Sequence, residues 1–118
     1  MLIQRKTIKF NNSTYYVGVS TYPNKRVCLT IENKKEKHYI TINFDELYVN
    51  KNHVLLDPII TRNGLLRILK KKRIIKSIYG ATNYGHVPIP IAEINLGILK
   101  RYDYLGVMEY LDNGGINE

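Results

Sequence analysis

Hydrophobic and polar residues alternate along four short runs near the start of the chain. The runs are Lys6 to Phe10, Thr14 to Thr21, Arg26 to Glu32 and His38 to Phe44, and polar turn clusters separate them. Alternation with a period of two is typical of strands that bury one face. Short polar connections join such strands as antiparallel neighbours. We therefore expect a four-stranded antiparallel meander.

Between Thr61 and Lys76 the spacing changes to that of an amphipathic helix. One side collects aliphatic residues: Leu65, Leu66, Ile68 and Leu69. The other side collects cations: Arg67, Lys70, Lys71 and Lys72, followed by Arg73 and Lys76. The pattern predicts one central basic helix that covers the sheet. Thr61 or Asn63 is the expected N-cap, and the cations favour an end within Lys71 to Lys76.

The segment after the predicted helix first loses its hydrophobic period. Ser77 to Gly85 is rich in glycine, tyrosine and polar residues, so we expect an exposed loop there. Val87 to Ile94 is apolar but contains Pro88 and Pro90. Because a proline has no N–H to donate to a neighbouring strand, this run is predicted to be an edge strand.

The C-terminal part carries weaker signals. Asn95 is placed to cap a short helix that runs through Arg101. Tyr102 to Leu111 suits either a strand or a helical turn. We expect residues 1–118 to form a single α+β domain, with frayed ends at 1–5 and 112–118.

The composition indicates a globular protein in a reducing compartment. Hydrophobic residues make up 44% of the 118 residues, which is too many for a disordered chain. Cys28 is the only cysteine, so no intramolecular disulfide can form. No apolar run approaches the roughly 20 residues that cross a bilayer, and the N-terminal MLIQRKTIKF lacks a signal-peptide core. We expect a cytoplasmic location and no membrane partner.

The charge balance favours an anionic partner. The chain has 18 Lys and Arg residues against 10 Asp and Glu residues, which gives a net charge of +8. Such an excess suits nucleic acid, nucleotides or an acidic protein surface. A lysine-rich surface that only reflects an AT-rich genome explains the same excess. Ten tyrosines add stacking faces and hydroxyl groups of the kind used at binding surfaces.

The residue types of enzyme chemistry are scattered. No phosphate-binding glycine loop, dinucleotide fingerprint or cysteine pair for zinc is present. The three histidines are dispersed: His38, His53 and His86. Pairing His53 with Asp57, or His86 with Glu93, rests on proximity in the sequence alone, and Cys28 suits a buried apolar position better than a nucleophile. We therefore expect a binding protein rather than an enzyme, without catalytic residues, metal or cofactor.

Two features form the candidate ligand site. The first is the group of cations on and after the predicted helix, Arg67 to Lys76, which suit phosphate groups. The second is the segment Tyr79 to His86, which offers stacking rings, hydrogen-bonding side chains and glycines that allow close approach. A solvated helix face and a plain surface loop are the competing interpretations. Together the two features predict these ligand-binding residues: Arg67, Lys70, Lys71, Arg73, Tyr79, Asn83, Tyr84 and His86.

The order of five short runs resembles that of a family of small uncharacterised proteins from phages and mobile elements of Gram-positive bacteria. The runs are TYPNKRVCLTI, HYITINF, NHVLLDPI, NGLLRIL and VPIPIAEI, and the resemblance spans roughly Tyr15 to Glu93. It implies a short meander, a helix near the middle and a late strand. It also implies an accessory anti-defence protein that acts by binding in the cytoplasm of the bacterial host cell. No catalytic residue carries over.

The resemblance and the charge together lead to three expected functions. The first is a non-enzymatic sponge that sequesters a nucleotide-derived immune signal, with cations on its phosphates and tyrosines on its base. Such a sponge is expected to be a homo-oligomer, because subunits together enclose a ligand more completely. The second is an inhibitor of a CRISPR-Cas effector that binds the protein or its guide RNA. The third is a nonspecific nucleic-acid-binding regulator, and an enzyme that degrades the signal ranks below all three.

Overall fold

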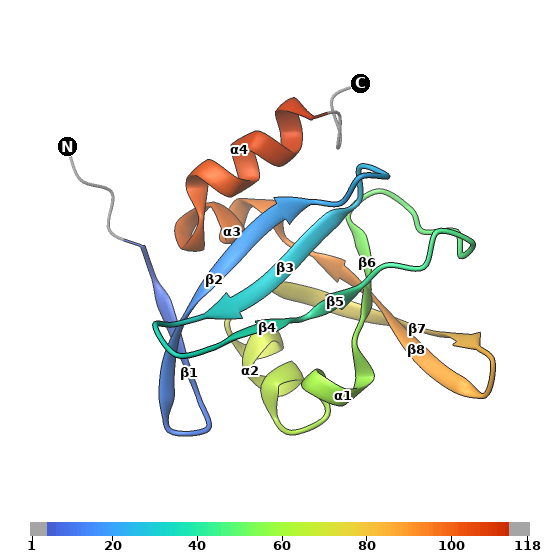
Figure 1. Cartoon of the computed structure of the whole chain (residues 1–118), viewed down its shortest axis with the longest axis horizontal. Coiled ribbons are helices and arrows are strands. Elements are labelled where there is room, and N and C mark those ends of the chain that lie inside the picture. Colours follow the sequence, from blue (N-terminus) through green and yellow to red (C-terminus); the bar gives the residue numbers. More distant parts are fainter. Residues whose placement is uncertain (1–4, 114–118) are drawn as a thin grey trace.

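The chain forms two four-stranded antiparallel sheets and four helices in a computed structural model that describes residues 5–113 (Figure 1). The first sheet contains, in order, β1 (Thr7–Phe10), β2 (Ser13–Thr21), β3 (Val27–Glu32) and β4 (Lys37–Tyr39). The second sheet contains, in order, β5 (Thr41–Ile42), β6 (His53–Leu56), β8 (Val87–Ile94) and β7 (Ile75–Tyr84). The helices are α1 (Pro58–Thr61), α2 (Leu65–Lys71), α3 (Leu96–Tyr102) and α4 (Tyr104–Asp112). This architecture confirms the predicted α+β class.

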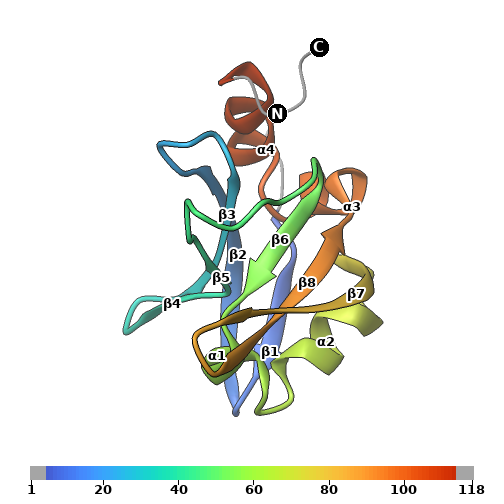
Figure 2. The same ribbon diagram turned by 90° about the vertical axis from the view of Figure 1, so that its right-hand side faces the viewer.

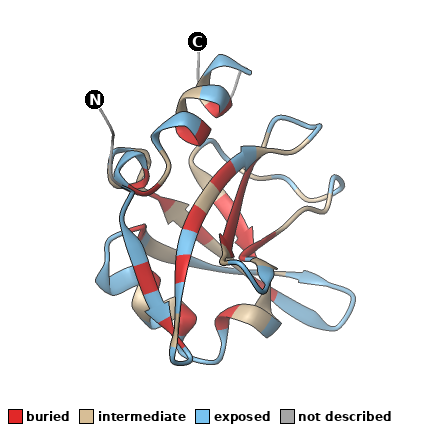
Figure 3. Ribbon diagram, turned by 60° about the vertical axis from the view of Figure 1, so that its left-hand side comes forward, coloured by how far each residue is buried: buried red, intermediate tan, exposed pale blue. Residues whose placement is uncertain are grey.

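One hydrophobic core contains residues of both sheets and of helices α2, α3 and α4. Buried and exposed residues alternate along β2 (Figure 3), as expected for a strand with one face on the core. Strand β3 instead buries five consecutive residues, so both of its faces are covered. Helices α3 and α4 lie against β2, whereas α2 lies against β1 and β7. The basic helix therefore closes one part of the core rather than covering a single sheet.

The fourth predicted strand, His38 to Phe44, is divided between the two sheets at Ile40. The Ile40 N–H donates to the Leu29 carbonyl at 2.8 Å, in the first sheet. Its own carbonyl accepts from the Asp57 N–H at 2.9 Å, just beyond β6 of the second sheet. The Ile40 side chain is fully buried. Because the hydrophobic alternation continues through this corner, the sequence pattern does not reveal it.

The predicted start of the helix near Thr61 is wrong, whereas its end at Lys71 falls within the predicted range of Lys71 to Lys76. Thr61 ends the separate short helix α1, which Asp57 caps by accepting from the Ile59 N–H. Helix α2 begins after Gly64, whose φ of +98° is accessible to glycine at little cost. No side chain caps α2, so neither Thr61 nor Asn63 has the expected role.

The predicted loop from Ser77 to Gly85 is instead most of strand β7. Its pairing with β8 extends from Ile75 opposite Ile94 to Tyr84 opposite Val87. Register shifts between Ile75 and Ser77 and between Ile78 and Gly80 interrupt the ladder. Bulges of this kind disrupt the strict alternation by which a strand is recognised in a sequence. Most of β7 is also exposed, which gives it the polar composition of a loop.

The predicted edge strand with Pro88 and Pro90 is also wrong, because β8 lies between β6 and β7. The prolines are tolerated because β6 pairs only with Ile91, Ala92 and Glu93 of β8. At Pro88 and Pro90, β8 has β7 as its one strand neighbour among the described residues. The missing N–H groups point to the open side, so the ladder loses no hydrogen bond.

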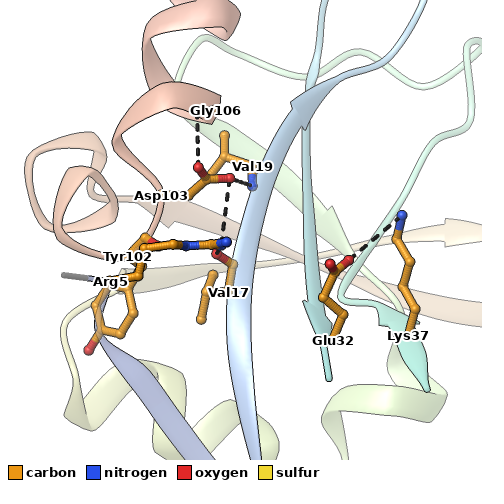
Figure 4. Close-up of polar contacts among 8 residues, drawn as sticks. All are labelled: Arg5, Val17, Val19, Glu32, Lys37, Tyr102, Asp103 and Gly106. Carbon is orange, nitrogen blue, oxygen red and sulfur yellow. Dashed lines mark hydrogen bonds and ion pairs between the residues drawn. The ribbon is translucent and has the colours of Figure 1, made fainter. Parts of the chain in front are cut away.

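The C-terminal part contains two helices. Asn95 caps α3 as predicted, and its side chain accepts from the Ile98 N–H at 3.1 Å. The ambiguous segment from Tyr102 to Leu111 is largely helix α4. Asp103 stands between the helices, and its carboxylate accepts from the Gly106 N–H at 3.0 Å and the Val19 N–H at 2.9 Å (Figure 4). One side chain therefore caps α4 and fastens that helix to the edge of β2.

Arg5 belongs to the predicted frayed N-terminus, but the structure anchors it. Its guanidinium donates to the Tyr102 carbonyl and to the Val17 carbonyl, each at 2.8 Å, and lies 3.9 Å from the Asp103 carboxylate (Figure 4). The predicted fraying of 1–4 and 114–118 concerns residues outside the described part of the chain. Asp112, at the start of the predicted C-terminal fray, is the last residue of α4.

Candidate anion-binding surface

Six exposed cations lie on α2 and in the turns on either side of it, and we call them the basic surface. They are Arg62, Arg67, Lys70, Lys71, Lys72 and Arg73. The α2 side chains Leu65 and Leu69 are fully buried on the opposite side, so the helix is amphipathic as predicted. None of the six cations forms an ion pair within residues 5–113. Their charge is therefore available to an external anion.

The distribution of acidic residues sets this surface apart from general lysine enrichment. Between Pro58 and Ala92 there is no aspartate or glutamate, yet seven of the 18 Lys and Arg residues lie there. The 10 acidic residues lie entirely before and after this stretch. Random enrichment in lysine would not remove the acids from the same segment. This absence of acids is a sequence signal that identifies Arg62 as a further member of the site, which the helix pattern missed.

The end of α2 places Arg73 in a conformation that is unusual for its side chain. The Arg73 N–H donates to the Lys70 carbonyl at 3.0 Å, and the Ile74 N–H donates to the Leu69 carbonyl at 3.0 Å. This is the Schellman arrangement, in which the residue after the C-cap is usually glycine. Arg73 occupies that position with a φ of +65°. The turn delivers Ile74 into the core, which is why the helix stops before Lys76.

Replacing Arg73 with glycine is expected to stabilise the fold by about 1 kcal/mol, because glycine adopts positive φ without steric cost. The same change removes one cation, so polyanion binding should weaken. Urea unfolding together with a binding titration measures both effects. Arg73→Ala is the matched control, because it removes the same charge while a Cβ remains at the positive φ. If Arg73→Gly were no more stable than Arg73→Ala, the strain argument would be wrong.

A hollow of about 430 Å³ lies between α1 and α2. It is lined by Thr61, Arg62, Gly64, Leu66, Arg67 and Lys70. Half of these residues are cations of the basic surface, and none is acidic. The hollow is open to solvent on a broad side, so it offers a docking surface for phosphates rather than a closed pocket.

Tyr79 lies on the outer side of the second sheet, where other side chains hold it. Its hydroxyl donates to the Glu93 carboxylate at 2.8 Å, and its ring stacks on His53 with 4.7 Å between centroids. Lys76 lies 3.7 Å from the same carboxylate. The hydrogen bond from Tyr79, followed by the charges of Lys76 and His53, lowers the pKa of Glu93. His53 is therefore next to Glu93, rather than to Asp57.

Tyr84 is at the far end of β7 and is held in a similar way. Its ring stacks on Phe44 with 3.9 Å between centroids and an interplanar angle of 2°. Its hydroxyl donates to the Glu46 carboxylate at 3.1 Å, which raises the pKa of Tyr84. Arg26 anchors the Phe44 loop by donating to the Phe44 carbonyl at 2.9 Å. Tyr84 remains 41% exposed, so one face of the ring pair is still accessible.

The structure does not gather the predicted ligand-binding residues into one site. Arg67, Lys70, Lys71 and Arg73 belong to the basic surface, whereas Tyr79, Asn83, Tyr84 and His86 follow along the β7–β8 hairpin. Helix α2 lies beside the start of β7, and the hairpin turn lies at its other end (Figure 2). Nine residue steps along a strand cover about 30 Å, so the hairpin tip is well separated from α2. Tyr84 is therefore far from the basic surface, whereas the cation near Tyr79 is Lys76, which is paired with Glu93.

A separate polar cluster on the β3–β4 hairpin gives a pH prediction. The Tyr15 hydroxyl donates to the Glu36 carboxylate, and His38 lies 3.3 Å from the same group. The hydrogen bond from Tyr15 is the largest cause that lowers the pKa of Glu36 below its ordinary value of 4.5. A carboxylate with a lowered pKa stabilises the fold above its unfolded pKa, and this contribution is lost as pH falls through the folded pKa.

Glu36→Gln is therefore expected to lower stability at pH 7, with a difference from the wild type that disappears as the pH falls below 4.5. Urea unfolding at several pH values measures the difference. Glu109→Gln is the control, because Glu109 is an exposed glutamate on α4. A difference that stays constant between pH 7 and acid would mean that the Glu36 charge is not involved.

Metal sites and membrane-spanning helices are two further features that would indicate a function. No group of three or more His, Cys, Asp and Glu side chains within residues 5–113 is arranged to hold a metal ion. Among the helices of the same residues, none is long and apolar enough to span a membrane.

Comparison with known proteins assigns the chain to no family. No family model, curated protein or solved structure matches the chain. The resemblance to phage and mobile-element proteins therefore stays an expectation. The basic surface, described from its own geometry, is the feature that supports a function.

Proposed function

We propose that this protein is a non-enzymatic binding protein whose basic surface takes the phosphate groups of a nucleic acid strand. The observation that carries the proposal is the set of six exposed cations around α2, which form no ion pair within residues 5–113 and lie in a stretch of chain that lacks acidic residues. Cations that neutralise phosphates release condensed counterions, and this release drives nucleic acid binding. Arg73, held at positive φ where glycine would be favoured, suggests that this charge is retained at a cost in stability.

The shape of the surface supports a strand of nucleic acid more than a single nucleotide. Small-ligand pockets bury most of the ligand and usually include apolar or aromatic walls. The hollow between α1 and α2 is broadly open, and it includes one large apolar residue, Leu66. The tyrosines expected to hold a base are already stacked on His53 and Phe44 elsewhere. The biological setting that we propose is anti-defence binding, with the guide RNA of a CRISPR effector as one suitable strand.

Sequestration of a nucleotide-derived immune signal is the second candidate. Its supporting observation is the volume of the hollow, about 430 Å³, which falls within the roughly 300–1,000 Å³ typical of small-ligand sites. A second copy of the chain would have to close the open side. A cyclic nucleotide at 100 times its dissociation constant would then stabilise the fold by about 2.7 kcal/mol, in a manner that tolerates salt.

Fluorescence anisotropy with labelled single-stranded RNA, single-stranded DNA and duplex DNA tests the main proposal. The test variant carries Arg62→Gln, Arg67→Gln and Lys70→Gln. The control variant carries Lys9→Gln, Lys25→Gln and Lys34→Gln, which removes the same charge from exposed lysines outside the basic surface. We expect the test variant to bind at least tenfold more weakly, and its salt slope on a single strand to fall by about 2.

Three results would contradict the proposal. Equal losses in both variants would mean that net charge, rather than this surface, attracts the strand. An absence of binding by the wild type at low salt would exclude a nucleic acid partner. A salt-tolerant thermal shift with a cyclic nucleotide, in the absence of RNA binding, would favour the sponge instead.

A further inference from the structure

The free edge of β7 lacks the features that usually protect a sheet edge over its last five residues, Gly80 to Tyr84. β7 pairs with β8 and forms an end of the second sheet. Natural edge strands are protected by charges, prolines or bulges. The register shifts of β7 lie before Gly80, so Gly80 to Tyr84 pairs with β8 without a further shift. No charged residue occurs between Ser77 and Ala92, and the β7–β8 hairpin extends away from the body of the molecule (Figure 1).

The hairpin geometry fixes which backbone groups face the free edge. Gly85 and His86 form a two-residue turn, so Tyr84 and Val87 exchange hydrogen bonds across it. Partners then alternate along the ladder, and Ala81 and Asn83 direct their N–H and C=O groups away from β8. The residues opposite these two confirm the alternation, because both are prolines without an N–H to share. Ala81 and Asn83 therefore present two donors and two acceptors to the outside.

These groups are self-complementary when two copies pair antiparallel about Thr82. Ala81 of one copy then lies opposite Asn83 of the other, and the two pairs form four backbone hydrogen bonds. Thr82 lies opposite its own copy, a pairing that is favourable between strands. Tyr84 lies opposite Gly80, where a Cβ would find no atom within 4 Å. A tyrosine covering a glycine of a neighbouring strand is a known stabilising pair in sheets.

We infer that β7 is a dimerisation edge, whose occupant is the same edge of a second copy of this chain. The register between the two β7 strands is fixed at both ends of the paired segment. The bulge at Tyr79 ends the regular pairing on one side and the turn at Gly85 ends it on the other. The strands themselves bring no like charges together, since Lys76 is the one charged residue of β7 and lies outside the paired segment. The contact continues the second sheet across a two-fold axis, as an isologous interface requires. A five-residue pairing is short, so the dimer is in concentration-dependent equilibrium with monomers.

A cysteine at the axis tests the register directly. In the inferred dimer the two Thr82 residues form a non-hydrogen-bonded pair, with Cα atoms about 4.5 Å apart, a separation that a disulfide accommodates. Thr82→Cys is expected to give a covalent dimer under oxidised glutathione. Thr14→Cys is the matched control, because Thr14 is an exposed threonine on β2, away from the edge. The buried Cys28 is common to both variants.

Sedimentation velocity over a range of concentrations tests the dimer without a cross-link. The wild type should show a reversible monomer–dimer equilibrium. Thr82→Lys places two like charges opposite each other and should weaken association at least tenfold, while its circular dichroism and melting temperature show that it is folded. The inference is overturned if Thr82→Cys cross-links no faster than Thr14→Cys. It is equally overturned if the wild type sediments as a monomer throughout, or if Thr82→Lys associates as the wild type does.

Discussion

Gly106→Ala is expected to lower the free energy of unfolding by about 1–3 kcal/mol, the cost of forcing an extra carbon into a packed contact. A Cβ at Gly106 would lie less than 3.0 Å from the Val19 carbonyl oxygen and from the Asp103 carboxylate. Neither group can move freely, because one belongs to the backbone of β2 and the other caps α4. The alanine must therefore push the first turn of α4 away from the sheet. Urea unfolding followed by circular dichroism measures the effect.

Gly97→Ala is the matched control for this prediction. Gly97 is also a helical glycine, but it is exposed, and its nearest neighbour would lie 3.4 Å from the new Cβ. Alanine is favoured over glycine inside a helix, so this variant should gain up to about 1 kcal/mol. Changes of opposite sign in the free energy of unfolding of the two variants would locate the effect in the contact between α4 and β2. Equal effects would contradict it.

The strands of the first half were predictable because each buries one face and carries a clean alternation. Ser13–Thr21 and Val27–Glu32 agree with the runs read from the sequence to within about a residue at each end. The division at Ile40 was not predictable, because the change of sheet depends on which distant carbonyls and N–H groups accept the backbone. Local hydrophobic pattern contains no information on such long-range partners.

The second half shows how tertiary contacts override local signals. Residues 61–76 have a helical stripe, yet the helix covers only Leu65–Lys71, because a turn at Gly64 precedes it and Ile74 and Ile75 are buried in the core after it. Ser77 to Tyr84 has the composition of a loop, yet β8 supplies a partner that organises it as a strand. Pro88 and Pro90 correctly indicate a missing neighbour, but only along part of β8. In each case the sequence indicates a real local preference of the backbone, but the length over which that preference holds is set by contacts with distant residues.

The candidate site was partly predictable for a related reason. Charge is a local property, so the cations of α2 were found from the sequence alone. The combined site with the tyrosines was an inference from closeness in sequence. An extended β7 instead carries the two groups apart, and Glu93 and Glu46 hold the tyrosine hydroxyls. Arg62 was missed because a turn separates it from the helix, whereas the acid-free stretch around it was visible throughout.

Asp103→Ala is expected to be the most destabilising of the polar substitutions, at about 2–4 kcal/mol, because it removes two different interactions. The helix α4 loses its N-cap, since the Gly106 N–H no longer has an acceptor. The Val19 N–H also loses its acceptor where β2 extends beyond β1, and Val19 is 6% exposed, so water cannot readily replace the carboxylate. Arg5 loses its ionic partner but keeps its two bonds to backbone carbonyls.

Asp103→Ser separates the two contributions. A serine can still cap α4, but its shorter side chain cannot also reach the Val19 N–H, so this variant should recover about 1 kcal/mol of the loss. Hydrogen exchange at the Val19 amide should be faster in both variants, whereas exchange in the first turn of α4 should be faster in Asp103→Ala alone. If Asp103→Ser were as stable as the wild type, the bond to β2 would contribute nothing. In that case the attachment of α4 would depend on the packing of Val107 and Tyr110 in the core.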